Sequence, residues 1–179
     1  MSVFTNAASG GQEQAREYTR AVLDLVGGRD PLGLLDSTPS EARRTIRGLT
    51  REQLRTPEAP GKWSVQHVVQ HLADSDMVWG NRLRLVLSHE KPVLTGYDQD
   101  LWANRLRYDE SDPEEALNDF TELRAMNLRL LRRAERADWV RVGIHVERGE
   151  ESVEHMVRLY AGHDVLHLRQ LERIARAVS

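Results

Sequence analysis

The sequence contains no cysteine. This absence excludes disulfide bonds, thiolate metal ligands and a protein thiol as nucleophile. No stretch approaches the roughly 18 uncharged apolar residues that a membrane-spanning helix needs. The opening segment MSVFTNAASGGQEQ also lacks the basic and apolar regions of a secretory signal. We therefore expect a cytoplasmic protein that has no membrane partner.

A strong charge of one sign is missing as well. The 25 basic and 28 acidic residues leave a net charge of −3, and the two signs are interleaved along the chain. A nucleic-acid-binding protein concentrates positive charge on one face or helix. We therefore expect no nucleic-acid partner and predict that the ligand is a small molecule.

Helix signals dominate the 179 residues, which fit a single domain. Thr38-Pro39 and Asp112-Pro113 each combine an N-cap residue with proline at the first helical position, and Ser64 and Ser152 are further N-cap candidates. We expect a tail over residues 1–11 and one helical domain over residues 12–179. Its fold class is all-α, a four-helix bundle with an extra N-terminal helix. The predicted bundle helices cover about residues 38–54, 64–89, 113–134 and 152–178.

One segment has the pattern of a strand. Val140, Val142, Ile144 and Val146 alternate with other residues. No second strand is evident from the sequence. We therefore interpret residues 139–146 as an extended loop or a minor ribbon.

Two pairs of histidines have the spacing that lets both rings reach one metal ion from a single helix: His67 with His71, and His163 with His167. Helix phase turns His163 and His167 toward the bundle interior and places His71 beside the apolar stripe of its helix. His67 falls on the polar side. This predicts a site made by His71, His163 and His167. Two buried histidines one turn apart are equally consistent with hydrogen-bonded core residues.

Other polar and aromatic residues are candidates for the surroundings of this site. Asp164, on the apolar face of the last helix, would either orient a ligand histidine or pair with an arginine of a neighbouring helix. Gln170, one turn beyond His167, is a second candidate for holding a ligand ring. Further candidates for the substrate pocket are Trp63, Tyr97, Trp102 and Asn127. For each of these four, core packing or a core hydrogen bond is the competing interpretation.

Four segments resemble the DinB/YfiT-like family, and along the chain they follow the family's order. APGKWSV at 59–65 with QHLADS at 70–75 is similar to the family's second-helix motif, and LYAGHDVLHLRQ at 159–170 resembles its closing motif of two histidines. Between them, Lys91-Pro92 with YDQDLWA at 97–103, and GEES at 149–152, resemble the connectors of the YfiT-like branch. One departure is the pair Gln70-His71 followed by Asp76, where YfiT relatives have further histidines.

The resemblance implies a four-helix bundle that binds nickel or zinc through His71, His163 and His167, and it suggests a homodimer. Active members of the family are S-transferases using bacillithiol or mycothiol, or related isomerases and amide hydrolases. Three histidine ligands leave open positions on a divalent ion, where a bound thiol or water becomes more acidic. Our first hypothesis is a metal-dependent transferase with a bacillithiol-like co-substrate. A metal-dependent amide hydrolase and a non-catalytic metal or small-ligand binding protein are the alternatives. No general acid or base can be assigned.

Overall fold

A computed structural model describes residues 11–179. The first helix begins at Gly11, so residues 1–10 of the predicted tail lie outside the described residues. Three short strands form one sheet, in the order β1-β2-β3. The strands are β1 (Val93–Leu94), β2 (Val142–His145) and β3 (Gly149–Ser152). The helices are α1 (Gly11–Val26), α2 (Pro31–Ile46), α3 (Arg51–Arg55), α4 (Val65–Ser88), α5 (Gln99–Arg105), α6 (Pro113–Leu131) and α7 (Val153–Val178).

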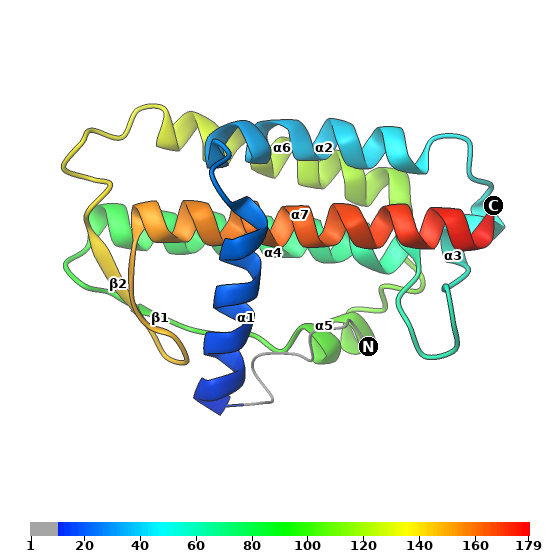
Figure 1. Ribbon diagram of the computed structural model, residues 1–179, viewed down its shortest axis with the longest axis horizontal. Coiled ribbons are helices and arrows are strands. Elements are labelled where there is room, and N and C mark those ends of the chain that lie inside the picture. Colours follow the sequence, from blue (N-terminus) through cyan, green and yellow to red (C-terminus); the bar gives the residue numbers. More distant parts are fainter. Residues whose placement is uncertain (1–10) are drawn as a thin grey trace.

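The four long helices α2, α4, α6 and α7 form a bundle, which confirms the predicted fold class (Figure 1). The colours of Figure 1 show that α2 and α7 run in one direction and that α4 and α6 run in the other. Helix α1 is the extra N-terminal helix and lies across α7. No helix of the described residues is both long and apolar enough to cross a membrane.

The predicted helix over 38–54 is wrong in its boundaries. It is two helices: α2 begins at Pro31, where the Asp30 side chain accepts hydrogen bonds from two backbone N–H groups, and it ends at Ile46. A separate capping box of Thr50 and Gln53 starts α3. Asp30-Pro31 carries the same start signal as Thr38-Pro39, and sequence alone does not rank the two.

Pro39 therefore lies inside α2 rather than at its start. Proline has no backbone N–H, so the carbonyl of Leu35, four residues earlier, has no partner within the helix. Arg124 of α6 supplies that partner, because its Nη1 donates to the Leu35 carbonyl at 2.7 Å. The proline thus creates an acceptor that a neighbouring helix uses.

The direction of the helices explains the long connector between α4 and α6. Because these two neighbours run in parallel, the chain from 89 to 112 must travel back along the bundle, and it carries β1 and α5 on the way (Figure 1). The segment at 139–146, interpreted as an extended loop or a minor ribbon, contains β2. It pairs antiparallel with β3 and parallel with β1. The partner strands β1 and β3, of two and four residues, show no strand pattern in the sequence.

Two apolar clusters fill the bundle, one containing Phe120 and the other Trp79. The guanidinium of Arg124 lies 4.9 Å from the ring centre of Phe120 and 5.7 Å from that of Trp79. A polar layer therefore separates the two clusters. On the outside of α7, a Cβ at Gly162 would stand 1.9 Å from the Val22 carbonyl oxygen, so only glycine lets α1 approach this closely.

Candidate metal centre

Three histidines meet in the polar layer, His71 from α4 and His163 and His167 from α7. Each offers one ring nitrogen, and these nitrogens all lie within 4.8 Å of one another. Nε2 of His71 and Nε2 of His163 are 3.1 Å apart. Two nitrogens bound about 2.0–2.1 Å from one ion at tetrahedral or octahedral angles would be about 2.9–3.4 Å apart. The arrangement fits one divalent metal ion.

The tautomers that the surroundings favour also fit a metal. Nδ1 of His167 lies 2.8 Å from Oε1 of Gln170, so its Nε2 is left to face the cluster. Nδ1 of His163 has no hydrogen bond, but Oδ1 of Asp164 lies 3.8 Å away. That negative charge favours a proton on Nδ1 and leaves Nε2 as the ligand atom.

Burial keeps the rings of His71 and His167 neutral, as metal ligands must be. The pKa of His71 is well below its ordinary value, because burial disfavours the charged form and His167 and His163 would repel a second cation. For the same reasons the pKa of His167 falls to about 3: burial is the largest cause and the neighbouring His163 adds to it. Protons therefore compete little for the ring nitrogens of His71 and His167 at neutral pH.

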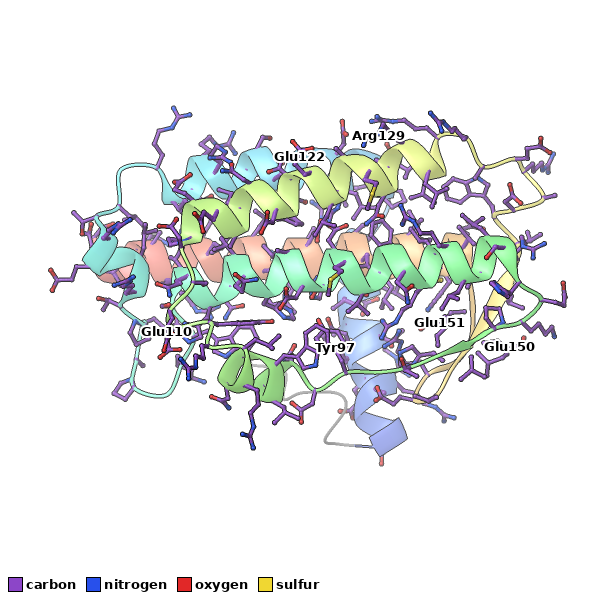
Figure 2. The ribbon with its side chains drawn as sticks, turned by 180° about the vertical axis from the view of Figure 1, so that it is seen from behind. Tyr97, Glu110, Glu122, Arg129, Glu150 and Glu151 are labelled. Atoms are coloured by element: carbon purple, nitrogen blue, oxygen red, sulfur yellow. The ribbon has the colours of Figure 1, made fainter. Side chains whose placement is uncertain are left out.

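A hydroxyl pair lies beside His71. The Ser75 hydroxyl is 3.4 Å from Nε2 of His71 and 2.7 Å from the hydroxyl of Tyr97, which comes from the connector. In Figure 2, Tyr97 lies between the connector and the bundle helices. Burial raises the pKa of Tyr97, so its hydroxyl stays protonated. Trp63 covers another side of His71, with ring centres 5.1 Å apart.

Asp164 makes its strong contacts away from the histidines. Its two oxygens accept from Nη1 and Nη2 of Arg124 at 2.5 and 3.1 Å, and Asp76 accepts from Nε of the same arginine at 2.6 Å. This is the salt bridge that the sequence left open as an alternative role for Asp164. Burial would raise the pKa of Asp164, but Arg124 holds it below its ordinary value. Burial raises that of Asp76 to about 6 against the opposing effect of Arg124, and the charge of Asp164 adds to the rise.

Three of the predicted pocket residues have other surroundings. Asn127 is fully buried and donates to the carbonyl and carboxylate of Asp76, so it belongs to the Arg124 network. Trp102 contacts Tyr97 with the two rings tilted by 44°, and it packs on the apolar core. Trp63 is 8% exposed and contacts His71, but it does not line the cavity that borders His163. His67, expected on the polar side, is half-buried and lies 2.9 Å from the Ser64 hydroxyl, outside the cluster.

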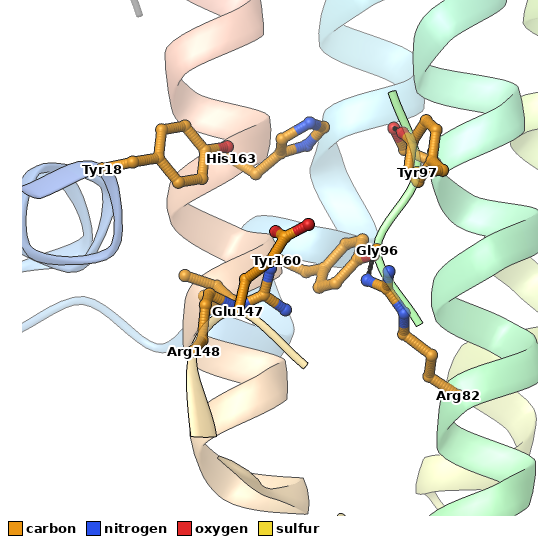
Figure 3. Close-up of a pocket in the computed structure, with 10 residues that line it drawn as sticks. Tyr18, Arg82, Gly96, Tyr97, Glu147, Arg148, Tyr160 and His163 are labelled. Carbon is orange, nitrogen blue, oxygen red and sulfur yellow. Dashed lines mark hydrogen bonds between the residues drawn. The ribbon is translucent and has the colours of Figure 1, made fainter. Parts of the chain in front are cut away.

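A cavity of about 90 Å³ borders His163. Figure 3 shows its wall built from separate segments, with Tyr18 of α1, Arg82 of α4, Tyr97 of the connector and Tyr160 of α7 around it. Among these, sequence reasoning found only Tyr97. A signal for Arg82 was present: it follows His71 by eleven residues, which is three helical turns and therefore the same side of α4.

Comparisons with known proteins agree with this architecture. The family model of the DinB superfamily matches residues 34–171. A candidate metal-dependent hydrolase of Oceanobacillus iheyensis is 33% identical over 79% of this chain and 82% of its own length. The candidate metal-dependent hydrolase YfiT of Bacillus subtilis is 30% identical over 80% of this chain and 81% of its own. The solved structure of Bacillus subtilis YfiT, described as a four-helix bundle of unusual topology, superposes with a TM-score of 0.75. It covers 94% of this chain and 89% of YfiT at 27% identity.

Proposed function

The chain belongs to the DinB superfamily, and from that premise we propose that it is a metal-dependent S-transferase that activates a low-molecular-weight thiol at His71, His163 and His167. The thiol is bacillithiol-like and comes from solution, since the chain has no cysteine of its own. The reaction forms a bond from sulfur to an electrophilic carbon. It breaks the bond from that carbon to a leaving group, and the thiol proton passes to solvent.

One observation carries the choice of a thiol. Within the described residues, no aspartate or glutamate joins the three-histidine cluster, and Asp76 and Asp164 are both bound to Arg124. When bound, a divalent ion supplies Lewis-acid chemistry that lowers the pKa of a coordinated thiol or water. A thiol then needs no further base, whereas amide hydrolysis also needs a group that hands a proton to the leaving amine.

The surrounding residues have distinct roles in this proposal. Gln170 binds Nδ1 of His167 and so leaves Nε2 free to hold a metal ion. The Tyr97 and Ser75 hydroxyls, 2.7 Å apart, are neutral donors that can bind a developing negative charge on the electrophile. Trp63 limits the access of water to His71. His163, whose side chain is 12% exposed, forms the border between the cluster and the cavity.

Nickel or zinc is the proposed metal, because neutral imidazole ligands suit both ions. The three nitrogens leave at least one coordination position for a substrate. A homodimer remains a prediction from the family resemblance.

The second candidate function is hydrolysis of an amide. It is supported by the names of the relatives, which give them as candidate metal-dependent hydrolases. Glu147, a half-buried carboxylate that lines the cavity, could then serve as the proton-transferring group.

A paired assay tests the proposal. The protein loaded with nickel or zinc is mixed with a cysteine-based thiol and 1-chloro-2,4-dinitrobenzene, and separately with a panel of amides. We expect thioether formation above the uncatalysed rate, a loss of that rate in His163→Ala, and an unchanged rate in His67→Ala. Amide cleavage without thioether formation would overturn the proposal in favour of the hydrolase. Neither reaction, with one tightly bound metal per chain, would support a non-catalytic binding protein.

A further inference from the structure

Arg82 is a buried cation that makes no direct salt bridge within the described part of the chain. It is 5% exposed. Its Nη1 donates to the Tyr160 hydroxyl at 3.2 Å and its Nη2 donates to the Thr95 carbonyl, while Nε is buried without a partner. Both of its acceptors are neutral. A buried guanidinium without a counter-charge is costly, so this position calls for an explanation.

Two other arginines of the interior, Arg124 and Arg148, provide a comparison. Arg124 binds two carboxylates. Arg148, which lines the same cavity as Arg82, makes two hydrogen bonds to the carboxylate of Glu151, at 2.5 and 3.0 Å. Each of these guanidinium groups is neutralised within the chain, and only Arg82 of the three is not.

The cavity beside Arg82 has the size and chemistry of a binding site for a small anion. Its volume of about 90 Å³ equals that of about three water molecules in the liquid. The hydroxyls of Tyr97 and Tyr160 lie at its wall, and burial raises the pKa of both, so they remain hydrogen-bond donors. In Figure 3, the Arg82 side chain extends from α4 toward Tyr160, with His163 further along α7.

We infer that this cavity binds the carboxylate group of the substrate, with Arg82 as the group that recognises it and His163 at the end where the substrate reacts. A planar guanidinium matches a carboxylate in shape and charge, and its remaining N–H groups have no other acceptor. The substrate class is therefore a small carboxylic acid whose reactive atom lies a few bonds from the carboxylate. This deepens the proposed function, on which it rests for the role of His163.

Glu147 restricts the proposed class of substrate further. Its carboxylate lines the same cavity and is half-buried, and Figure 3 shows it in front of Tyr160. No salt bridge of the described residues includes it. A second carboxylate on the ligand would be repelled here, whereas an amino group would be attracted. Monocarboxylates and amino acids should consequently bind better than dicarboxylates.

Binding measurements on the full-length protein, as isolated and without added thiol, test this inference. Propanoate is compared with propionamide, which has nearly the same shape and no charge, by ligand-observed NMR. We expect propanoate to bind the wild type at least about tenfold more tightly than propionamide. In Arg82→Gln this ratio should fall to near one, and Arg82→Lys should restore it in part because it keeps the charge.

Arg84→Gln is the matched control, since Arg84 lies on the same helix but bonds to Asn127 and the Gly80 carbonyl instead. It should keep the wild-type ratio. Circular dichroism and metal content are measured for each variant, so that misfolding or metal loss is recognised. Equal binding of the two ligands by the wild type, or an unchanged ratio in a folded Arg82→Gln, would overturn the inference. An unchanged ratio would indicate that the carboxylate binds the metal. Because no thiol is present, these results do not depend on whether the transferase activity is found.

Discussion

Two buried polar regions lie close together in this bundle and differ in one respect. The Arg124 network joins all four bundle helices, and each carboxylate in it meets a guanidinium or amide donor. Around the histidines and Arg82, by contrast, buried nitrogens of His71, His163, His145 and Arg82 have no partner. Both regions carry the cost of removing polar groups from water. Only the first recovers that cost within the chain, and this difference is the basis of our proposal that the second region binds ligands.

The largest effect on stability should follow from breaking the Arg124 network. Arg124→Met leaves Asp76 and Asp164 buried without their counter-charge, and we expect the free energy of unfolding to fall by about 3–5 kcal/mol. Urea denaturation of the metal-free protein measures it. Arg132→Met is the control, because its ion pair with Asp36 is exposed on the surface; it should change stability by less than about 1 kcal/mol. Similar losses of stability in Arg124→Met and Arg132→Met would contradict the stabilising role of the Arg124 network.

In the region around the three histidines, replacing a residue that orients a histidine ring should affect metal binding more than stability. Gln170→Leu removes the acceptor that orients His167, and we expect metal affinity to drop about 10- to 100-fold. Competition with a chromophoric chelator measures this loss. Gln70→Leu serves as the matched control, since Gln70 adjoins His71 but bonds to Asp74. A loss in the control equal to that of Gln170→Leu would show that the effect is not specific to the ring.

Acid should lower the free energy of unfolding through His145, which lies in the region around the histidines and Arg82. Burial, followed by the charges of Arg148 and Arg82, lowers the pKa of His145 to about 4. Below its ordinary pKa of about 6.5 the unfolded chain takes up a proton that the folded chain refuses, so stability is full above pH 6.5 and declines toward pH 4. We expect this part of the decline, on the order of 1–2 kcal/mol, to disappear in His145→Gln. Denaturation series at several pH values give the slope of the free energy of unfolding against pH for the wild type and for His145→Gln. Parallel slopes would contradict the assignment.

The smallest effect is predicted for His67. It bonds to Ser64 and stacks on Trp63, and it lies outside the three-histidine cluster. His67→Ala should leave metal content unchanged, as measured by elemental analysis beside His71→Ala, which should reduce it. Metal loss in both variants would show that we assigned the metal site to the wrong face of α4.

Helix phase was enough to bring together His71, His163 and His167, because a regular helix fixes the side on which each residue lies. Capping signals also located α4, α6 and α7 to within a few residues. The start of α2 was missed, since two equivalent proline signals stand eight residues apart. The burial of Arg82 was missed for another reason. Arginine is ordinarily a surface residue, and nothing local to the sequence shows that the connector and α7 enclose it.

The sequence also could not show which arginine would meet Asp164. That partner comes from a helix 40 residues away, and the pairing depends on the way four helices assemble. Asp164 and Asn127 were recognised as polar residues on apolar faces, which is the local signal. Their assignment to one network needed the tertiary structure.

Pro39 has a consequence for how the bundle assembles. Along α2, the carbonyl of Leu35 is freed by a proline, and Arg124 bonds to it while also holding Asp76 and Asp164. If α2 slid by one turn against α6, the guanidinium would face carbonyls already bonded within the helix, and the Leu35 carbonyl would lose its donor. Apolar ridges alone would tolerate such a slip. A single imino acid thus specifies the alignment of two helices by removing a hydrogen bond.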